Sequence, residues 1–236
     1  MTSVSGAVVQ SLLSQVGKLK WQFSFAGPYH RYKKEWKIAT VFIGANNLCA
    51  ACGSGEDIPP TADPKTYGSL LKQALRDLKA AAGPTFVNLV GIFDVSLVYD
   101  LSRGYPYCEF LFDKNPIPIC GCATGDEKDR KRVGDLAKEY NRVMRRVAYE
   151  INEENKDDGT FGVSFQPGLT SFKESSAPFG QGYMSGLDCF HPNKCANQIM
   201  AIALWNNMFA SGLKKKSPKK PEDVKIFCPG PEDYLK

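Results

Sequence analysis

An aspartate and a histidine three residues apart, Asp188 and His191, form the pair with the clearest catalytic chemistry in the sequence. They precede an expected helix, so the carboxylate can reach one imidazole nitrogen while the other nitrogen faces a cleft. Such a carboxylate fixes the tautomer of the ring and stabilises the imidazolium that forms when the histidine takes a proton from a nucleophile. We interpret His191 as a candidate base oriented by Asp188. A capped turn or a packed histidine would show the same spacing.

An asparagine that follows a short apolar run is the second candidate. Asn46 comes directly after Gly44 and Ala45, where the run at 36–43 ends. A side-chain amide fixed in a tight turn can donate a hydrogen bond to developing negative charge, as in an oxyanion hole. The alternative is an ordinary turn, in which the asparagine and the glycine serve only the backbone.

Eight cysteines, an even number, are more than a cytosolic domain of 236 residues usually keeps. They favour disulfides and an oxidising compartment, but eight cysteines allow about 105 pairings, so the sequence does not define which cysteines pair.

Cys49 and Cys52 have the spacing of a thiol–disulfide oxidoreductase. Because glycine and serine follow at 53–55 where a helix would have to begin, we expect one structural disulfide or two separate ones.

No set of metal ligands is evident. Cys120 and Cys122 are close in sequence, but a zinc site would need a second such pair or nearby histidines, and His191 is distant. We therefore expect neither a metal nor a cofactor.

Hydrophobic periodicity predicts alternating helices and strands. Helical spacing occurs at 7–19, 63–82, 126–154 and 194–209, and short apolar runs typical of buried strands occur at 36–43, 85–93 and 161–165. A loop rich in Pro, Gly and Cys is expected at about 104–125. This alternation predicts a parallel sheet covered by helices on both faces, with ligand sites in loops at the carboxyl ends of the strands. Asn46 and the Asp188–His191 segment both lie in such loops.

Composition and charge narrow the class of protein. The chain is 43% hydrophobic and contains no run of about 18 apolar residues that could cross a bilayer. Much of the formal charge of +5 comes from lysines at 214–216 and 219–220. We therefore interpret 213–236 as a basic tail or linker and 1–212 as one domain, and we expect no nucleic-acid binding. Residues 1–9 lack the pattern of a secretory signal.

Three stretches, in the expected order, resemble the phospholipase B group of SGNH (GDSL) ester hydrolases. The run from Trp36 to Cys49, WKIATVFIGANNLC, closely resembles the third conserved block of that family. The segment from Ala81 to Val90 and the segment from Asp188 to Met208 agree as well. The resemblance extends from about Val4 to Cys228, which is nearly the whole chain.

The resemblance implies a three-layer α/β/α sandwich with a parallel, flavodoxin-like sheet. It implies that His191 is the general base, that Asp188 is its partner, and that Asn46 and Gly6 donate to the oxyanion. The implied reaction is hydrolysis of carboxylic esters in phospholipids or other acyl-ester substrates, without a cofactor, at a membrane or micelle surface. With the cysteine content, it also implies the secretory route or the outer face of a membrane. We expect a monomer.

Two departures from the family pattern affect these expectations. The nucleophilic serine lies in a Gly-Asp-Ser motif, which does not occur in the 236 residues, and Ser54 sits in the wrong block and lacks the Gly-x-Ser-x-Gly elbow. We therefore expect an N-terminally truncated domain with exposed strand edges and no turnover, or alternatively a lipid-binding pseudoenzyme. Asn47 stands where the family usually has aspartate, which puts the orientation of the oxyanion loop in question.

Overall fold

The computed structural model describes residues 3–52, 58–114, 119–170, 181–216 and 224–236. Three parallel strands form its sheet in the order β1-β2-β3: β1 (Lys37–Val41), β2 (Thr85–Val90) and β3 (Phe161–Gln166). The long helices are α1 (Val9–Gln22), α3 (Pro64–Ala82), α7 (Glu127–Glu154) and α8 (Lys194–Phe209). The predicted alternation of helices and strands is confirmed.

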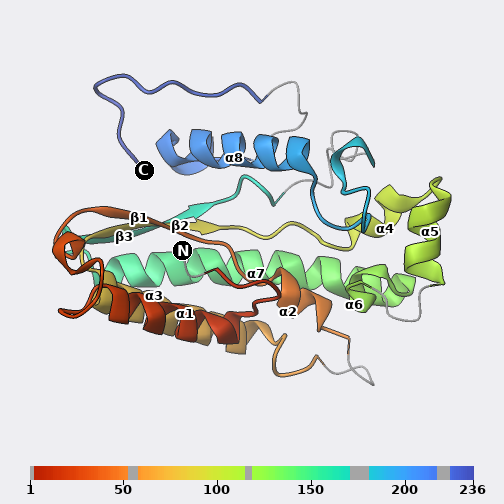
Figure 1. Ribbon diagram of the computed structural model, residues 1–236, viewed down its shortest axis with the longest axis horizontal. Coiled ribbons are helices and arrows are strands. Elements are labelled where there is room, and N and C mark those ends of the chain that lie inside the picture. Colours follow the sequence, from red (N-terminus) through yellow and green to blue (C-terminus); the bar gives the residue numbers. More distant parts are fainter. Residues whose placement is uncertain (1–2, 53–57, 115–118, 171–180, 217–223) are drawn as a thin grey trace.

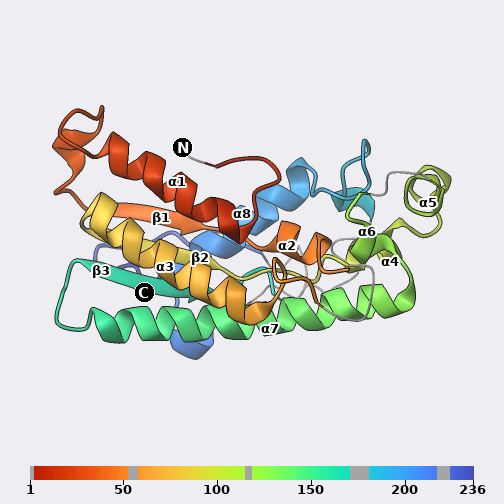
Figure 2. The ribbon, with the colours of Figure 1, turned by 90° about the horizontal axis from the view of Figure 1, so that it is seen from below.

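The helices cover both faces of the sheet. Helices α1, α3 and α7 pack side by side on one face, and α8 lies across the other face, against β3 (Figures 1 and 2). The predicted three-layer α/β/α architecture is therefore confirmed. Val87 and Leu89 of β2 are fully buried in the main core under the three helices, whereas Val90 points to a smaller cluster with Leu169 and Ala196 under α8.

Local capping explains why the long helices begin where the sequence indicated. The side chain of Asp63 accepts a hydrogen bond from the backbone N–H of Thr66 at 2.7 Å, and Pro64 occupies the first position of α3. Asp126 accepts from the N–H of Asp129 at 2.8 Å at the start of α7. Each cap satisfies backbone donors that the first turn of a helix leaves free.

Several shorter elements connect these layers, and one prediction about them is wrong. The short helices are α2 (Ala45–Cys49), α4 (Leu97–Ser102), α5 (Pro106–Asp113) and α6 (Gly121–Thr124), and 3-10 turns lie at η1 (His30–Tyr32), η3 (Gln181–Tyr183) and η4 (Gly212–Lys214). The expected loop at 104–125 thus contains two helices, α5 and α6. Pro106 suits the first turn of α5, and the buried ring of Phe112 anchors it, which the turn-like composition concealed.

Strand β1 is an edge of the described sheet. Ile38 of β1 is 57% exposed, and Phe42, which directly follows the strand, is 46% exposed.

The C-terminal segment runs back along α8 (Figure 1). The indole N–H of Trp205 donates to the carbonyl of Phe227 at 2.8 Å, and the amide of Asn206 donates to the carbonyl of Lys225 at 2.7 Å. These bonds attach the described part of 213–236 to the domain. The boundary at 212 stays a prediction.

Candidate active site

Asp188 and His191 are in direct contact. The Nδ1 atom of His191 lies 2.7 Å from Oδ2 of Asp188, and Oδ1 of the same carboxylate accepts from the backbone N–H groups of Phe190 and His191, both at 3.0 Å. The side chain of His191 is 67% exposed, whereas that of Asp188 is 29% exposed. The structure therefore brings the predicted pair together and leaves the ring open to solvent.

The charge on Asp188 determines which ring nitrogen is available. Partial burial acts to raise the pKa of Asp188, but the hydrogen bonds from the ring and backbone of His191 and from the backbone of Phe190 outweigh it, so the pKa lies below its usual value. An ionised carboxylate only accepts hydrogen bonds, so it orients the tautomer with a proton on Nδ1. The Nε2 atom of His191 then has a free lone pair.

The segment that carries the pair is held as a closed loop. The N–H of Ser185 donates to the carbonyl of His191 at 2.8 Å, and the N–H of Cys189 donates to the carbonyl of Ser185 at 2.9 Å. Cys189 has a φ of 53°, a left-handed conformation that a non-glycine residue seldom adopts. Asn193 caps α8 by accepting from the N–H of Ala196 at 3.1 Å and donates to the carbonyl of Gly182 at 2.8 Å, which fixes the loop to the helix.

Helix α5 supports this loop from the other side, and the sequence did not indicate this contact. Cys108 of α5 forms a disulfide with Cys189, and the hydroxyl of Tyr107 donates to the carbonyl of Leu187 at 2.9 Å. Each contact joins residues about 80 positions apart. No local pattern could have indicated either residue, because α5 itself was expected to be loop.

The segments that carry the two residues predicted to bind the oxyanion, Asn46 and Gly6, are joined by a hydrogen bond. The amide of Asn46, near the start of α2, donates from Nδ2 to the carbonyl of Ala7 at 3.0 Å, and Ala7 directly follows Gly6. Gly6 has a φ of 70°, which favours glycine. Gly44, before α2, has a φ of 121°, and a Cβ atom there would lie 2.4 Å from Cδ1 of Ile92. The turn that presents Asn46 therefore requires glycine.

Asn47 has a structural role that a carboxylate could not perform in full. It is completely buried. Its Oδ1 atom accepts from the N–H of Val9 at 2.9 Å, and its Nδ2 atom donates to the carbonyl of Thr61 at 2.7 Å and to the side chain of Gln10 at 3.1 Å. The amide thereby fastens α2 to the start of α1 and to the segment before α3. These bonds hold the loop that carries Asn46 without the carboxylate that the family usually has.

Two disulfides lie beside α2. They are Cys49–Cys120 and Cys52–Cys122, so of the two expected alternatives, one structural disulfide or two separate ones, the second is found. Ser54 lies outside the described residues. In the part of the chain that the structure describes, no three or more His, Cys, Asp or Glu side chains are grouped to bind a metal ion.

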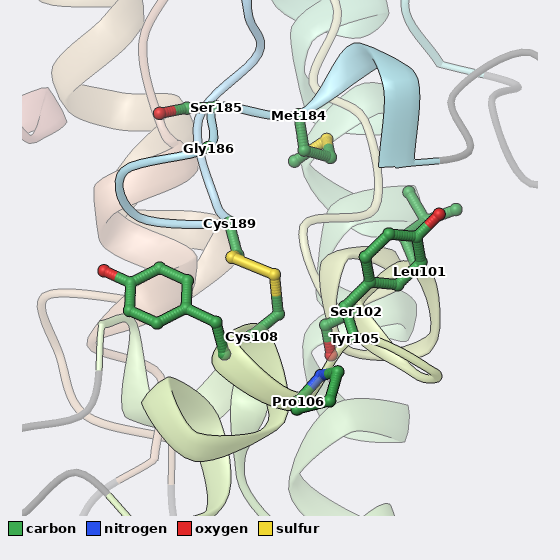
Figure 3. A pocket seen from close by; sticks show the side chains of 10 residues that line it. Leu101, Ser102, Tyr105, Pro106, Cys108, Met184, Ser185, Gly186 and Cys189 are labelled. Carbon is green, nitrogen blue, oxygen red and sulfur yellow. A yellow bond between two sulfur atoms is a disulfide. The ribbon is translucent and has the colours of Figure 1, made fainter.

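A cavity of about 320 Å³ lies against the loop that carries the pair. It is bordered by α4, α5 and the segment between them on one side and by the loop on the other (Figure 3). Its lining residues are Leu101, Ser102, Tyr105, Pro106, Tyr107, Cys108, Met184, Ser185, Gly186 and Cys189. Neither Asp188, His191, Asn46 nor Gly6 lines it, and among the described residues no hydrogen bond joins Asn46 to His191.

Comparison with known proteins agrees with the resemblance seen in the sequence. The sequence profile described as GDSL-like Lipase/Acylhydrolase matches residues 2–204. The chain is 27% identical over 232 residues to mouse "Phospholipase B1, membrane-associated", covering 96% of this chain and 15% of the relative. The human protein of the same name is 28% identical over 213 residues, covering 86% of this chain and 14% of the relative.

The chain therefore spans only about 15% of the length of these relatives. The match of the family profile, in contrast, extends over most of the 236 residues. This chain belongs to the GDSL-like lipase/acylhydrolase family.

Proposed function

We propose that this domain hydrolyses carboxylic esters of lipids, with His191 as general base and Asp188 as the group that orients it. One observation carries the proposal: the 2.7 Å contact between Nδ1 of His191 and Asp188, made by a histidine side chain that is 67% exposed. This arrangement is the base–acid part of a catalytic triad.

The reaction would run in two acyl-transfer steps. Nε2 of His191 takes the proton of a serine hydroxyl as the serine oxygen attacks the carbonyl carbon, and the imidazolium then protonates the departing alcohol. Water, activated by the same nitrogen, cleaves the acyl-enzyme and releases the carboxylic acid. The serine would come from a Gly-Asp-Ser segment, which is not among the 236 residues.

Asn46 and Gly6 would stabilise the oxyanion of each tetrahedral intermediate. A side-chain amide has two N–H donors, and Asn46 uses one of them for the carbonyl of Ala7. The second N–H would donate to the oxyanion, together with the backbone N–H of Gly6. This role requires Asn46 and His191 to face the same substrate carbonyl.

The substrate class and location follow from the relatives and the cysteines. The relatives are named as membrane-associated phospholipases, which supports phospholipids or similar acyl esters at a membrane or micelle surface as substrates. The three disulfides support the secretory route or the outer face of a membrane. No helix among the described residues is long and apolar enough to cross a bilayer. We expect the domain to act as a monomer.

A short-chain chromogenic ester tests the proposal. The chain as printed should give no turnover, whereas a version that carries the Gly-Asp-Ser segment upstream should hydrolyse the ester. In the serine-containing version, His191→Ala should lower kcat by several orders of magnitude, as removal of the base from a triad does. Cys195→Ser, which changes an exposed free cysteine near the pair, is the matched control. Retained activity in the His191→Ala variant would remove His191 from its role.

A lipid-binding pseudoenzyme is the second candidate. The observation that favours it is the absence of a Gly-Asp-Ser motif from the 236 residues. A serine-containing version that binds lipid but gives no turnover would support this candidate over the hydrolase.

A further inference from the structure

The cavity against the loop that carries Asp188 and His191 has an uncharged lining. None of its ten lining residues carries a formal charge, and leucine, proline, methionine and a disulfide contribute much of its wall. Arg103 is not a lining residue; it forms an ion pair with Asp113 at 2.7 Å and donates to the hydroxyl of the lining residue Ser102 at 3.0 Å. Such a wall favours an uncharged apolar ligand over a phosphate, because no charged side chain lines the cavity to compensate a buried charge.

The size of the cavity limits what it can hold. Its volume of about 320 Å³ lies at the lower end of the range of roughly 300–1,000 Å³ for small-molecule pockets. This space suits one hydrocarbon chain, not both chains of a phospholipid. Methionine is adaptable in shape, so Met184 can pack against chains of different length.

The cavity and the catalytic pair share one piece of backbone. Ser185 lines the cavity, and its N–H donates to the carbonyl of His191 at 2.8 Å. Cys189, which also lines the cavity, directly follows Asp188. Figure 3 shows the disulfide from Cys189 to Cys108 crossing from the loop to α5, with Met184 above and Pro106 below it. The cavity therefore lies against the loop that carries Asp188 and His191, although neither side chain lines it.

We propose that this cavity binds the acyl chain of the ester, and that the Cys108–Cys189 disulfide ties its wall to the loop that carries Asp188 and His191. The assignment of an acyl chain rests on the proposed ester hydrolysis. The binding itself does not need the nucleophile, so it can be measured on the chain as printed.

The test uses NMR of protein labelled with 13C at the methionine methyl groups, titrated with methyl hexanoate. Met184 lines the cavity, whereas Met144 is fully buried in the main core and serves as internal control. We expect a saturable shift of the Met184 methyl signal and no shift at Met144. Glycerophosphocholine, which has the polar headgroup without acyl chains, should shift neither signal.

Two variants on helix α4 test whether methyl hexanoate binds inside the cavity. Leu101→Trp enlarges a lining side chain and should weaken methyl hexanoate binding by about tenfold or more, since a loss of roughly 1.4 kcal/mol is already tenfold. Leu97→Trp, one turn earlier on α4, changes a side chain that packs in the same cluster but does not line the cavity, so it should leave binding unchanged. If Leu101→Trp fails to fold, which the Met144 signal reports, Tyr105→Ala takes its place and should also weaken binding.

The outcomes separate this inference from the proposed function. Binding does not require turnover, so a serine-containing version with His191 intact that binds methyl hexanoate but gives no turnover would overturn the proposed hydrolase alone. No saturable shift at Met184, a shift caused by glycerophosphocholine instead, or equal binding by the Leu101→Trp and Leu97→Trp variants would overturn the acyl-chain site.

Discussion

The backbone N–H of Val9 donates to Oδ1 of Asn47 at 2.9 Å, which joins the start of α1 to α2 across 38 positions of sequence. The same side chain donates to the carbonyl of Thr61 at 2.7 Å. One buried amide thus uses its acceptor and its donor groups to hold the two segments that carry Gly6 and Asn46. A side chain of the same shape that cannot donate a hydrogen bond would leave the carbonyl of Thr61 without this partner.

Asn47→Asp should therefore destabilise the fold. A carboxylate can still accept the hydrogen bond from Val9, but it cannot donate to Thr61 and Gln10. Its negative charge would also be buried, because the side chain at this position is completely buried. We expect a loss of about 2–4 kcal/mol in the free energy of unfolding at neutral pH. Urea denaturation at pH 7 and at pH 4 measures this loss, which should shrink at the lower pH as the carboxyl gains a proton. Equal stability of both proteins at pH 7 would contradict the assigned role.

The Cys108–Cys189 disulfide should be needed for the shape of the loop that carries Asp188 and His191. Its two cysteines are 81 residues apart, and replacing both by serine should cost about 2–5 kcal/mol of stability. Hydrogen exchange should quicken most at the N–H groups of Cys189 and Ser185, which close the loop. Cys195→Ser serves as control, because this cysteine is free and exposed. Unchanged exchange at both positions would show that the loop holds its shape alone.

Close packing of α3 against α7 should make Gly68 intolerant of a side chain. A Cβ atom at this position would lie 2.6 Å from Cγ1 of Val143, which is itself buried. Gly68→Ala should therefore cost about 1–3 kcal/mol by overpacking.

Gly17→Ala is the matched control for Gly68→Ala. A Cβ atom at Gly17, on the exposed side of α1, meets nothing within 4 Å. This substitution should stabilise the protein by about 0.5–1 kcal/mol through helix propensity. Thermal unfolding of both variants compares the two effects, and a stabilising Gly68→Ala would be incompatible with the described packing.

Glu154, at the end of α7, should contribute to loss of stability in acid. Hydrogen bonds from Arg76 and Lys72 lower the pKa of Glu154 to about 2 from an ordinary value of 4.5. A carboxyl whose pKa is lower in the folded state stabilises the fold above its unfolded pKa, and this contribution disappears as the pH falls through the folded value.

The stability of the wild-type protein should thus fall more steeply than that of Glu154→Gln between about pH 4.5 and pH 2. The effect should be small, because the pair is near the surface and salt screens it. Urea midpoints across this range measure it, with Glu153→Gln, an exposed neighbour, as control. Parallel curves for wild type and Glu154→Gln would rule out the expected contribution.

Most of the fold could be predicted because its signals are local. The start of α3 depends on Asp63 and Pro64, and the strand at 85–90 is a mostly apolar run that contains Asn88. The contact between Asp188 and His191 is likewise local, since three residues of a capped turn suffice to bring the carboxylate to the ring.

The remaining features depend on groups that are distant in sequence, and only folding brings them together. The partner of Cys189, the hydrogen bond from Tyr107 to Leu187 and the cavity between α5 and the loop all join segments about 80 residues apart. Eight cysteines allow many pairings, and a turn-like composition at 104–125 hid α5. The residue types therefore predicted a candidate base and its orienting carboxylate, whereas the packing of α5 against their loop created the cavity.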